Sequence, residues 1–192
     1  YNFKKVFESG KYAVFENLTV MPRAFLASNY EGPPHLEGSG FTRRVQPEGQ
    51  APKEVDKIRR KLIFGKLLSE DFDWRNVLIL EEPSPISAQF GPGTAEILSY
   101  KLQEVVIKTS SSEPKILFLS DNFYPGWKVQ VDGDETEILR ANYTFRAVPL
   151  TRGEHLVRFY FQSDTFFTGR LISLVSLVGL GFLVKLKRRE DR

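Results

Sequence analysis

The sequence lacks cysteine and contains only two histidines, and these absences exclude several kinds of chemistry. Without cysteine the chain has no disulfide, no thiolate nucleophile and no cysteine ligand for a metal. His35 lies in a Gly/Pro-rich segment and His155 opens an apolar one, so we expect no transition-metal site. There is also no G-x-S-x-G nucleophile elbow, and Gly91–Pro92–Gly93 lacks the Lys-Ser/Thr of a phosphate loop. We therefore predict no catalytic residue, no metal and no cofactor in this chain.

An excess of basic charge is also missing from most of the chain. The formal net charge is +3, but six basic and two acidic residues lie from Arg170 onward. The first 169 residues therefore carry 21 basic and 22 acidic side chains, a net charge of −1. A nucleic-acid interface needs basic charge gathered on a folded surface. We therefore expect no nucleic-acid partner.

Long apolar runs are scarce except near the C-terminus. Leu171–Val184 is uninterrupted, and its extension to Phe166 approaches the roughly 20 residues that a bilayer requires. Because basic residues follow at once, the positive-inside rule predicts a transmembrane helix at 164–186 with residues 1–165 outside the cell membrane. The basic tail, 187–192, would be cytoplasmic. An amphipathic or core helix is the alternative, but the stretch lacks a strongly polar face.

Short strands separated by turn residues fill the centre of the chain. This rhythm is typical of a β-sandwich, which we place at 84–163. The dipeptide Asp132–Gly133 predicts a hairpin turn, and Glu154–Phe161 lacks clean alternation, which predicts a central strand or one buried on both faces. The expected strands are Glu96–Ser99, Glu104–Thr109, Lys115–Leu119, Trp127–Val131, Thr136–Leu139, Thr144–Val148 and Glu154–Phe161.

The first 83 residues have a mixed pattern, and we interpret them as a small α/β subdomain. Lys11–Glu16 and Arg23–Ala27 are expected to be strands, and the apolar spacing from Lys53 to Leu68 predicts a helix. Val77–Leu80 suits a buried strand. Residues 32–52 are rich in glycine and proline and are expected to form an exposed loop. The fold class is thus mainly β with a small α+β part, followed by the C-terminal transmembrane helix.

The binding candidates follow one another in the second half of the sequence. Aromatic rings stack on sugars and also suit membrane interfaces, and polar side chains beside them supply hydrogen bonds. The alternative is that a Pro-Gly turn and an aromatic residue only close the end of the sandwich. Asp132 and Asp134 could form a carboxylate pair or a calcium site, although turn chemistry also explains them. The binding candidates are Asp121, Asn122, Tyr124, Trp127, Arg140 and Asn142.

One long segment, Leu117–Phe161, resembles the C-terminal region of the bacterial YfhO membrane protein family. An earlier pair of motifs, Glu16–Asn17 and Met21–Pro22–Arg23–Ala24–Phe25, resembles the family's asparagine and proline–arginine signature. The resemblance covers nearly the whole chain and is weakest between Gly32 and Pro52. The matching pieces of the long segment are Tyr124–Trp127, Val131–Gly133, Arg140–Tyr143, Phe145–Pro149 and Gly153–His155.

The resemblance implies a polytopic parent protein similar to C-type glycosyltransferases, which use lipid-linked sugar donors outside the membrane. This chain would then be the parent's C-terminal extracytoplasmic accessory domain and its final helix, and the catalytic acid would lie in an earlier outer loop. The implied partners are the lipid bilayer, the upstream helices of the parent, and a lipid-linked sugar or envelope glycan. The alternative is a non-catalytic, membrane-tethered β-sandwich that binds an envelope glycan or a protein.

Overall fold

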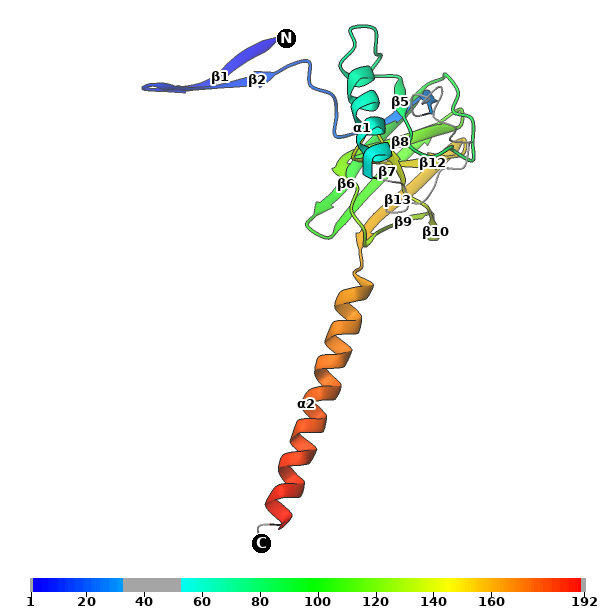
Figure 1. The fold of residues 1–192 in the computed structure, drawn as a ribbon. Helices are drawn as coiled ribbons and strands as arrows, with labels where there is room; N and C mark the ends of the chain where they lie inside the picture. The colour runs from blue at the N-terminus through cyan, green and yellow to red at the C-terminus, as the bar shows by residue number, and fades with distance from the viewer. Residues whose placement is uncertain (1, 33–52, 191–192) are drawn as a thin grey trace.

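A computed structural model describes residues 2–32 and 53–190, and it is mainly β (Figure 1). The predicted loop at 32–52 and His35 lie outside the described residues, apart from Gly32. Side chains are described except at 53–56, 164, 167 and 181–190. The elements are β1 (Phe3–Ser9), β2 (Tyr12–Asn17), β3 (Ala24–Ala27), β4 (Asn29–Glu31), α1 (Lys53–Leu67), β5 (Val77–Ile79), β6 (Gly93–Lys101), β7 (Glu104–Ser111), β8 (Lys115–Asn122), β9 (Trp127–Val131), β10 (Asp134–Thr136), β11 (Leu139–Ala141), β12 (Phe145–Leu150), β13 (Gly153–Phe161) and α2 (Asp164–Glu190).

Two larger sheets of the described residues pack together as a sandwich, so the predicted mainly β class is confirmed. One sheet has the order β10-β9-β13-β7-β6, and the other has the order β11-β12-β8-β3. Alternate residues of β13 point inward: Val157 and Phe159 are fully buried, whereas Leu156 is 49% exposed. Such alternation is what a sheet with one buried face requires. The inner faces meet in a core that includes Val105, Ile107, Leu117, Leu119, Val129, Val148, Val157 and Phe159.

The hairpin predicted at Asp132–Gly133 is present, with β9 paired to β10 and positive φ at both turn residues. The strand predicted at Thr136–Leu139 is wrong as a single element, because the chain changes sheets there. β10 pairs with β9 in the first sheet, and β11 pairs with β12 in the second.

The second sheet has a further apolar layer on its outer face. Ile116 and Phe118 of β8 pack there with Leu78 of β5 and with Leu80, which directly follows β5. The helix predicted from Lys53 is present as α1, and its Ile63 and Leu67 cover Ile79. β3 pairs with β8, so a strand of the N-terminal segment belongs to a sheet of the sandwich. The division of the chain at residue 83 remains a prediction.

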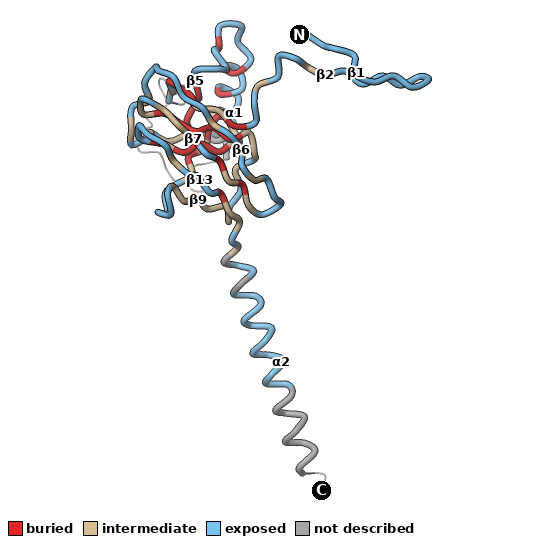
Figure 2. Tube along the Cα trace, turned by 180° about the vertical axis from the view of Figure 1, so that it is seen from behind, coloured by how far each residue is buried: buried red, intermediate tan, exposed pale blue. Residues whose placement is uncertain are grey.

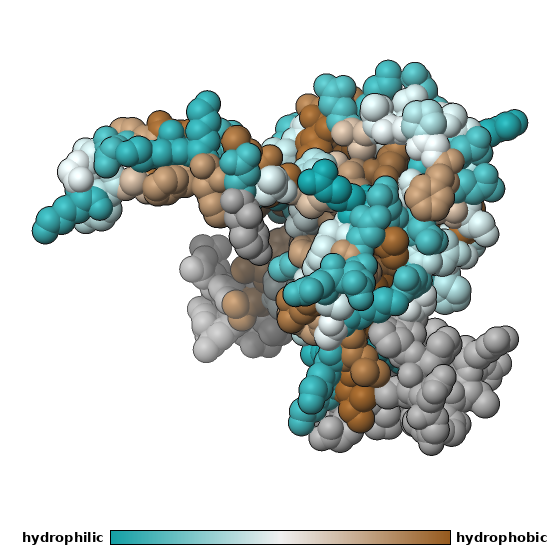
Figure 3. Space-filling view, turned by 90° about the horizontal axis from the view of Figure 1, so that it is seen from above, coloured by the Kyte–Doolittle hydropathy of each residue, from teal (hydrophilic) through white to brown (hydrophobic). Residues whose placement is uncertain are grey.

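The N-terminal hairpin, β1 with β2, projects from the sandwich (Figures 1 and 3). Within the described residues these two strands form a sheet of their own. Its side chains are mostly exposed, among them Phe7 at 58% and Tyr12 at 80% (Figure 2). Hydrophobic and hydrophilic residues both appear on it in Figure 3.

The C-terminal segment is helical as expected, but the predicted membrane span is not supported. Among the described residues, no helix combines the length and the apolar character needed to cross a bilayer. The span was predicted to reach residue 186, and the side chains from 181 onward lie outside those described. The tail predicted at 187–192 extends beyond the described helix, whose last residue is Glu190.

Candidate functional site

A hollow of about 550 Å³ lies at the end of the sandwich where α2 begins. Its position follows from strand register, because Trp127, which lines it, pairs with Phe161, the last residue of β13. The volume is within the roughly 300–1,000 Å³ range of ligand pockets. The residues that line it include Tyr100, Lys101, Leu102, Asp121, Asn122, Tyr124, Trp127 and Arg146.

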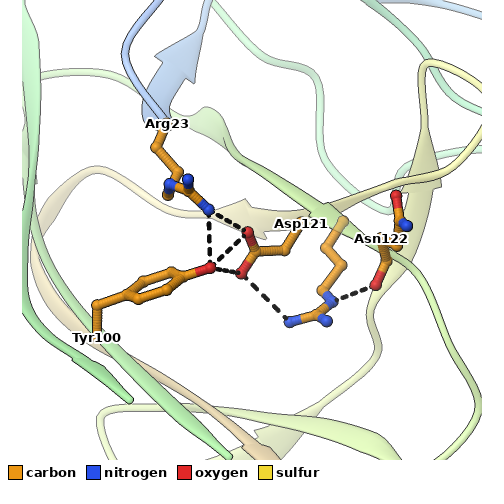
Figure 4. Close-up of polar contacts among 5 residues, drawn as sticks. Arg23, Tyr100, Asp121 and Asn122 are labelled. Carbon is orange, nitrogen blue, oxygen red and sulfur yellow. Dashed lines mark hydrogen bonds and ion pairs between the residues drawn. The ribbon is translucent and has the colours of Figure 1, made fainter. Parts of the chain in front are cut away.

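Asp121, at the end of β8, is the centre of a polar cluster in this hollow (Figure 4). Its Oδ1 accepts a hydrogen bond from Arg23 Nη1 at 3.0 Å and from the Tyr100 hydroxyl at 3.0 Å. Arg146 Nη1 lies 4.0 Å from its other oxygen, an ion-pair distance. The carboxylate side chain is 13% exposed. Three groups from different strands and loops therefore converge on one carboxylate.

Tyr100 remains a hydrogen-bond donor in this cluster. Burial and the hydrogen bond to Asp121 raise the pKa of its hydroxyl above the ordinary value. Arg23 Nη1 donates to the same hydroxyl at 2.7 Å, and the Arg23 guanidinium lies 4.8 Å from the centre of the Tyr100 ring. A neutral phenol at this position donates to the carboxylate without adding charge.

Arg146 of β12 is the most buried cation in the cluster, with 3% of its surface exposed. Its Nε donates to the carbonyl oxygen of Asn122 at 3.0 Å, and its guanidinium lies 3.8 Å from the centre of the Trp127 ring. Its Nη1 is buried and has no hydrogen-bond partner among the described residues. Burial lowers the pKa of Arg146, but arginine keeps its proton in proteins. The hollow therefore has a fixed cation on one wall.

The two aromatic candidates differ in how much of each ring is available. The Trp127 ring is covered by Arg146 on one face and packs edge-on against Phe161, at 5.7 Å between centroids. Tyr124 is 63% exposed at the rim. Gly126 between them has φ +98°, and a Cβ there would come within 2.9 Å of the Phe161 ring. Glycine is therefore required for the loop to pack this closely.

The structure brings together four of the six predicted binding residues and separates the other two. Asp121, Asn122, Tyr124 and Trp127 line the hollow. Arg140 instead lies 4.7 Å above the Phe123 ring and 3.8 Å from Glu81. The assignment of the six as binding residues remains a prediction.

Asn142 has a structural position away from the hollow. It is 3% exposed and adopts φ +46° in the turn before β12. Its Oδ1 accepts from the backbone N–H of Ile79, and its own N–H donates to the Ile79 carbonyl, both at 2.8 Å. These two bonds join the turn to β5.

Sequence reasoning missed three members of the cluster: Arg23, Tyr100 and Arg146. Both arginines stand inside motif pieces that carry the family resemblance, beside small and apolar residues that suit a buried strand. For Arg146 this context is a signal for a paired buried cation, whereas Arg23 is half exposed. Tyr100 gives no comparable signal, since it is one of the aromatic residues common in strands.

Asp132 and Asp134 do not form a described metal site. No group of three or more potential ligands gathers within the part of the chain that the structure describes. Asp132 instead binds His155, with 2.7 Å between Oδ2 and Nδ1, and accepts from the Leu156 N–H at 2.8 Å. The bond to His155 is the largest cause that lowers the pKa of Asp132. These contacts hold the β9–β10 turn against β13.

Comparison with known families gives a match that covers the sandwich from residue 89 and the first part of α2. The matched family is one of bacterial membrane proteins. It is the bacterial membrane protein YfhO family, matched over residues 89–173, so the resemblance seen in the sequence is confirmed for that part of the chain and membrane association is supported. No curated protein and no solved structure matches the chain.

Proposed function

We propose that this chain is the C-terminal extracytoplasmic accessory domain and final helix of a polytopic membrane protein. The parent would resemble a glycosyltransferase that uses a lipid-linked sugar and acts on cell-envelope glycans or glycolipids. The observation that carries the proposal is the hollow beside the start of α2, which combines an exposed aromatic ring with a carboxylate and a buried cation. In this arrangement the chain contributes binding and placement, and transfer chemistry belongs to the membrane portion of the parent.

The described part of α2 supports a membrane setting for the domain. Its apolar side chains are exposed on all sides, among them Ile172 at 61%, Leu174 at 58%, Val175 at 64%, Leu177 at 68% and Leu180 at 61%. Such positions go around the helix rather than along one face. A helix that is apolar all round is buried in protein or in lipid. We propose that α2 enters the bilayer, with residues 1–165 outside and the C-terminus in the cytoplasm.

The chemistry of the hollow favours a sugar ring as its ligand. Tyr124 offers an open ring for stacking against the apolar face of a pyranose. Asp121 accepts hydrogen bonds from hydroxyl groups, and Lys101, whose side chain is 71% exposed, donates to oxygen. Asp121 is already oriented by Arg23 and Tyr100, so ligand binding would not have to order it.

The test is a binding titration on the full chain in lipid nanodiscs. A Trp74→Phe background leaves Trp127, which lines the hollow, as the only tryptophan reporter. A polyprenyl-phosphate-linked hexose should change this fluorescence. Tyr124→Ala should weaken its binding roughly 5- to 10-fold, because loss of an aromatic contact costs about 1–1.4 kcal/mol.

Tyr12→Ala is the matched control, because Tyr12 is 80% exposed on the distant hairpin. Equal affinities of Tyr124→Ala and Tyr12→Ala would contradict the assignment of the hollow. The alternative is a tethered module that binds an envelope glycan. It would be favoured if the chain with Tyr124 intact bound a free oligosaccharide as tightly as the polyprenyl-phosphate-linked hexose.

A further inference from the structure

The end of the sandwich next to α2 is formed by two loops that are bonded to the chain just before the helix. Phe161 N–H donates to the Gln103 carbonyl at 3.0 Å, in the turn between β6 and β7. Gln162 N–H donates to the Gly126 carbonyl at 2.7 Å, in the loop between β8 and β9. From Phe161 to Asp164 the chain spans at most about 10 Å. Both loops are therefore fixed close to the first turn of α2.

The tips of these loops expose apolar and basic side chains. Leu102, at the β6–β7 turn, is 93% exposed, and Tyr124 in the other loop is 63% exposed. Lys101 stands beside Leu102 with a side chain that is 71% exposed and 3.9 Å from Glu104. The Glu104 carboxylate lies closer to Arg158, at 2.7 Å. A leucine, a tyrosine and a lysine next to one apolar helix have the composition of a membrane-interface surface.

We infer that this loop surface, defined by Lys101, Leu102 and Tyr124, rests on the lipid bilayer. Leu102 inserts below the headgroups, Tyr124 lies at the interface, and Lys101 faces anionic headgroups. The inference rests on the proposed entry of α2 into the bilayer. It goes further, because a tether alone would allow the sandwich to tilt away from the membrane.

This placement determines where the hollow opens. Lys101, Leu102 and Tyr124 line the hollow and also form the loop surface. A ligand in the hollow therefore lies at the depth of the headgroups. The domain would take a headgroup from the membrane without lifting the lipid tail into water.

The absence of cysteine permits a direct test with single environment-sensitive labels. Leu102→Cys, Leu174→Cys and Leu68→Cys would each carry an NBD fluorophore on the full chain in vesicles of phosphatidylcholine and phosphatidylglycerol. Leu68 is the matched control, because it is a leucine that is 75% exposed and directly follows α1, a helix that lies away from α2 (Figure 1). Iodide in the aqueous phase and a headgroup nitroxide lipid serve as quenchers.

We expect the label at residue 102 to be several-fold less quenched by iodide than the label at 68, and to be quenched by the nitroxide lipid. If the labels at 102 and 68 respond equally while the label at 174 is protected, α2 is in lipid and the inferred surface is wrong. If the label at 174 is as accessible to iodide as the label at 68, the proposed membrane entry of α2 fails, and the inference fails with it.

Discussion

The turn at Asn142 provides the sharpest test of how this fold is held together. Asn142→Ala removes the acceptor of the buried Ile79 N–H and places alanine at φ +46°. An unsatisfied buried donor costs about 1–3 kcal/mol, and the left-handed conformation costs alanine about 1 kcal/mol more than glycine. We therefore expect a loss of about 2–4 kcal/mol in the free energy of unfolding. Asn142→Gly removes only the hydrogen bond and should be about 1 kcal/mol milder.

The measurement is denaturant unfolding of the full chain in detergent, followed by circular dichroism of the β signal. Asn122→Ala is the matched control, because the Asn122 side chain is exposed and its backbone carbonyl, which Arg146 binds, is kept. This control should change stability by less than about 0.5 kcal/mol. If Asn142→Ala falls within about 0.5 kcal/mol of the control, the structural role of Asn142 is refuted.

Three further predictions concern charged groups. Arg146→Ala should destabilise the full chain by about 2 kcal/mol more than Arg23→Ala, because Arg146 is buried and stacked whereas the Arg23 side chain is 52% exposed; equal losses in denaturant unfolding would contradict this. His155 lowers the pKa of Asp132, so this carboxylate's contribution to stability is complete above its ordinary pKa and is lost as pH falls through the lowered one; Asp132→Asn should flatten the acid side of a stability–pH series, and an unchanged slope would argue against it. Burial lowers the pKa of Lys115, so the unfolded chain binds more protons in the interval below the ordinary lysine pKa, and stability rises with pH there; Lys115→Met should abolish that rise, and its persistence would show that another group causes it.

The central strands could be predicted from sequence because turn residues and apolar runs mark them directly. β9 begins and ends where the prediction placed it, and Asp132–Gly133 marks the following turn. The prediction that β13 is central or buried on both faces is confirmed in its first alternative, since the strand lies between β9 and β7 and has one exposed face. Leu156 is an exposed apolar residue, and a single exposed leucine cannot be told from a buried one by pattern alone.

The polar cluster was only partly predictable because its members come from distant parts of the chain. Asp121 and Trp127 stand in one short aromatic segment of the sequence, which allows both to be predicted together. Tyr100 and Arg23 reach Asp121 across separations of 21 and 98 residues. Local spacing contains no information on such contacts, which depend on how strands pair in the two sheets. The buried amine of Lys115, bonded to Ser28 Oγ at 2.6 Å, is hidden from pattern analysis for the same reason.

The short connection between β13 and α2 also has a mechanical consequence. Only Gln162 and Ser163 separate the strand from the helix, and the residues at this junction are bonded to both loops of the hollow. A force that tilts the helix therefore acts first on the hydrogen bonds to the Gln103 and Gly126 carbonyls, and only then on the interior of the sandwich. A change in helix tilt would therefore act first on the two loops that carry Leu102 and Tyr124 at the hollow.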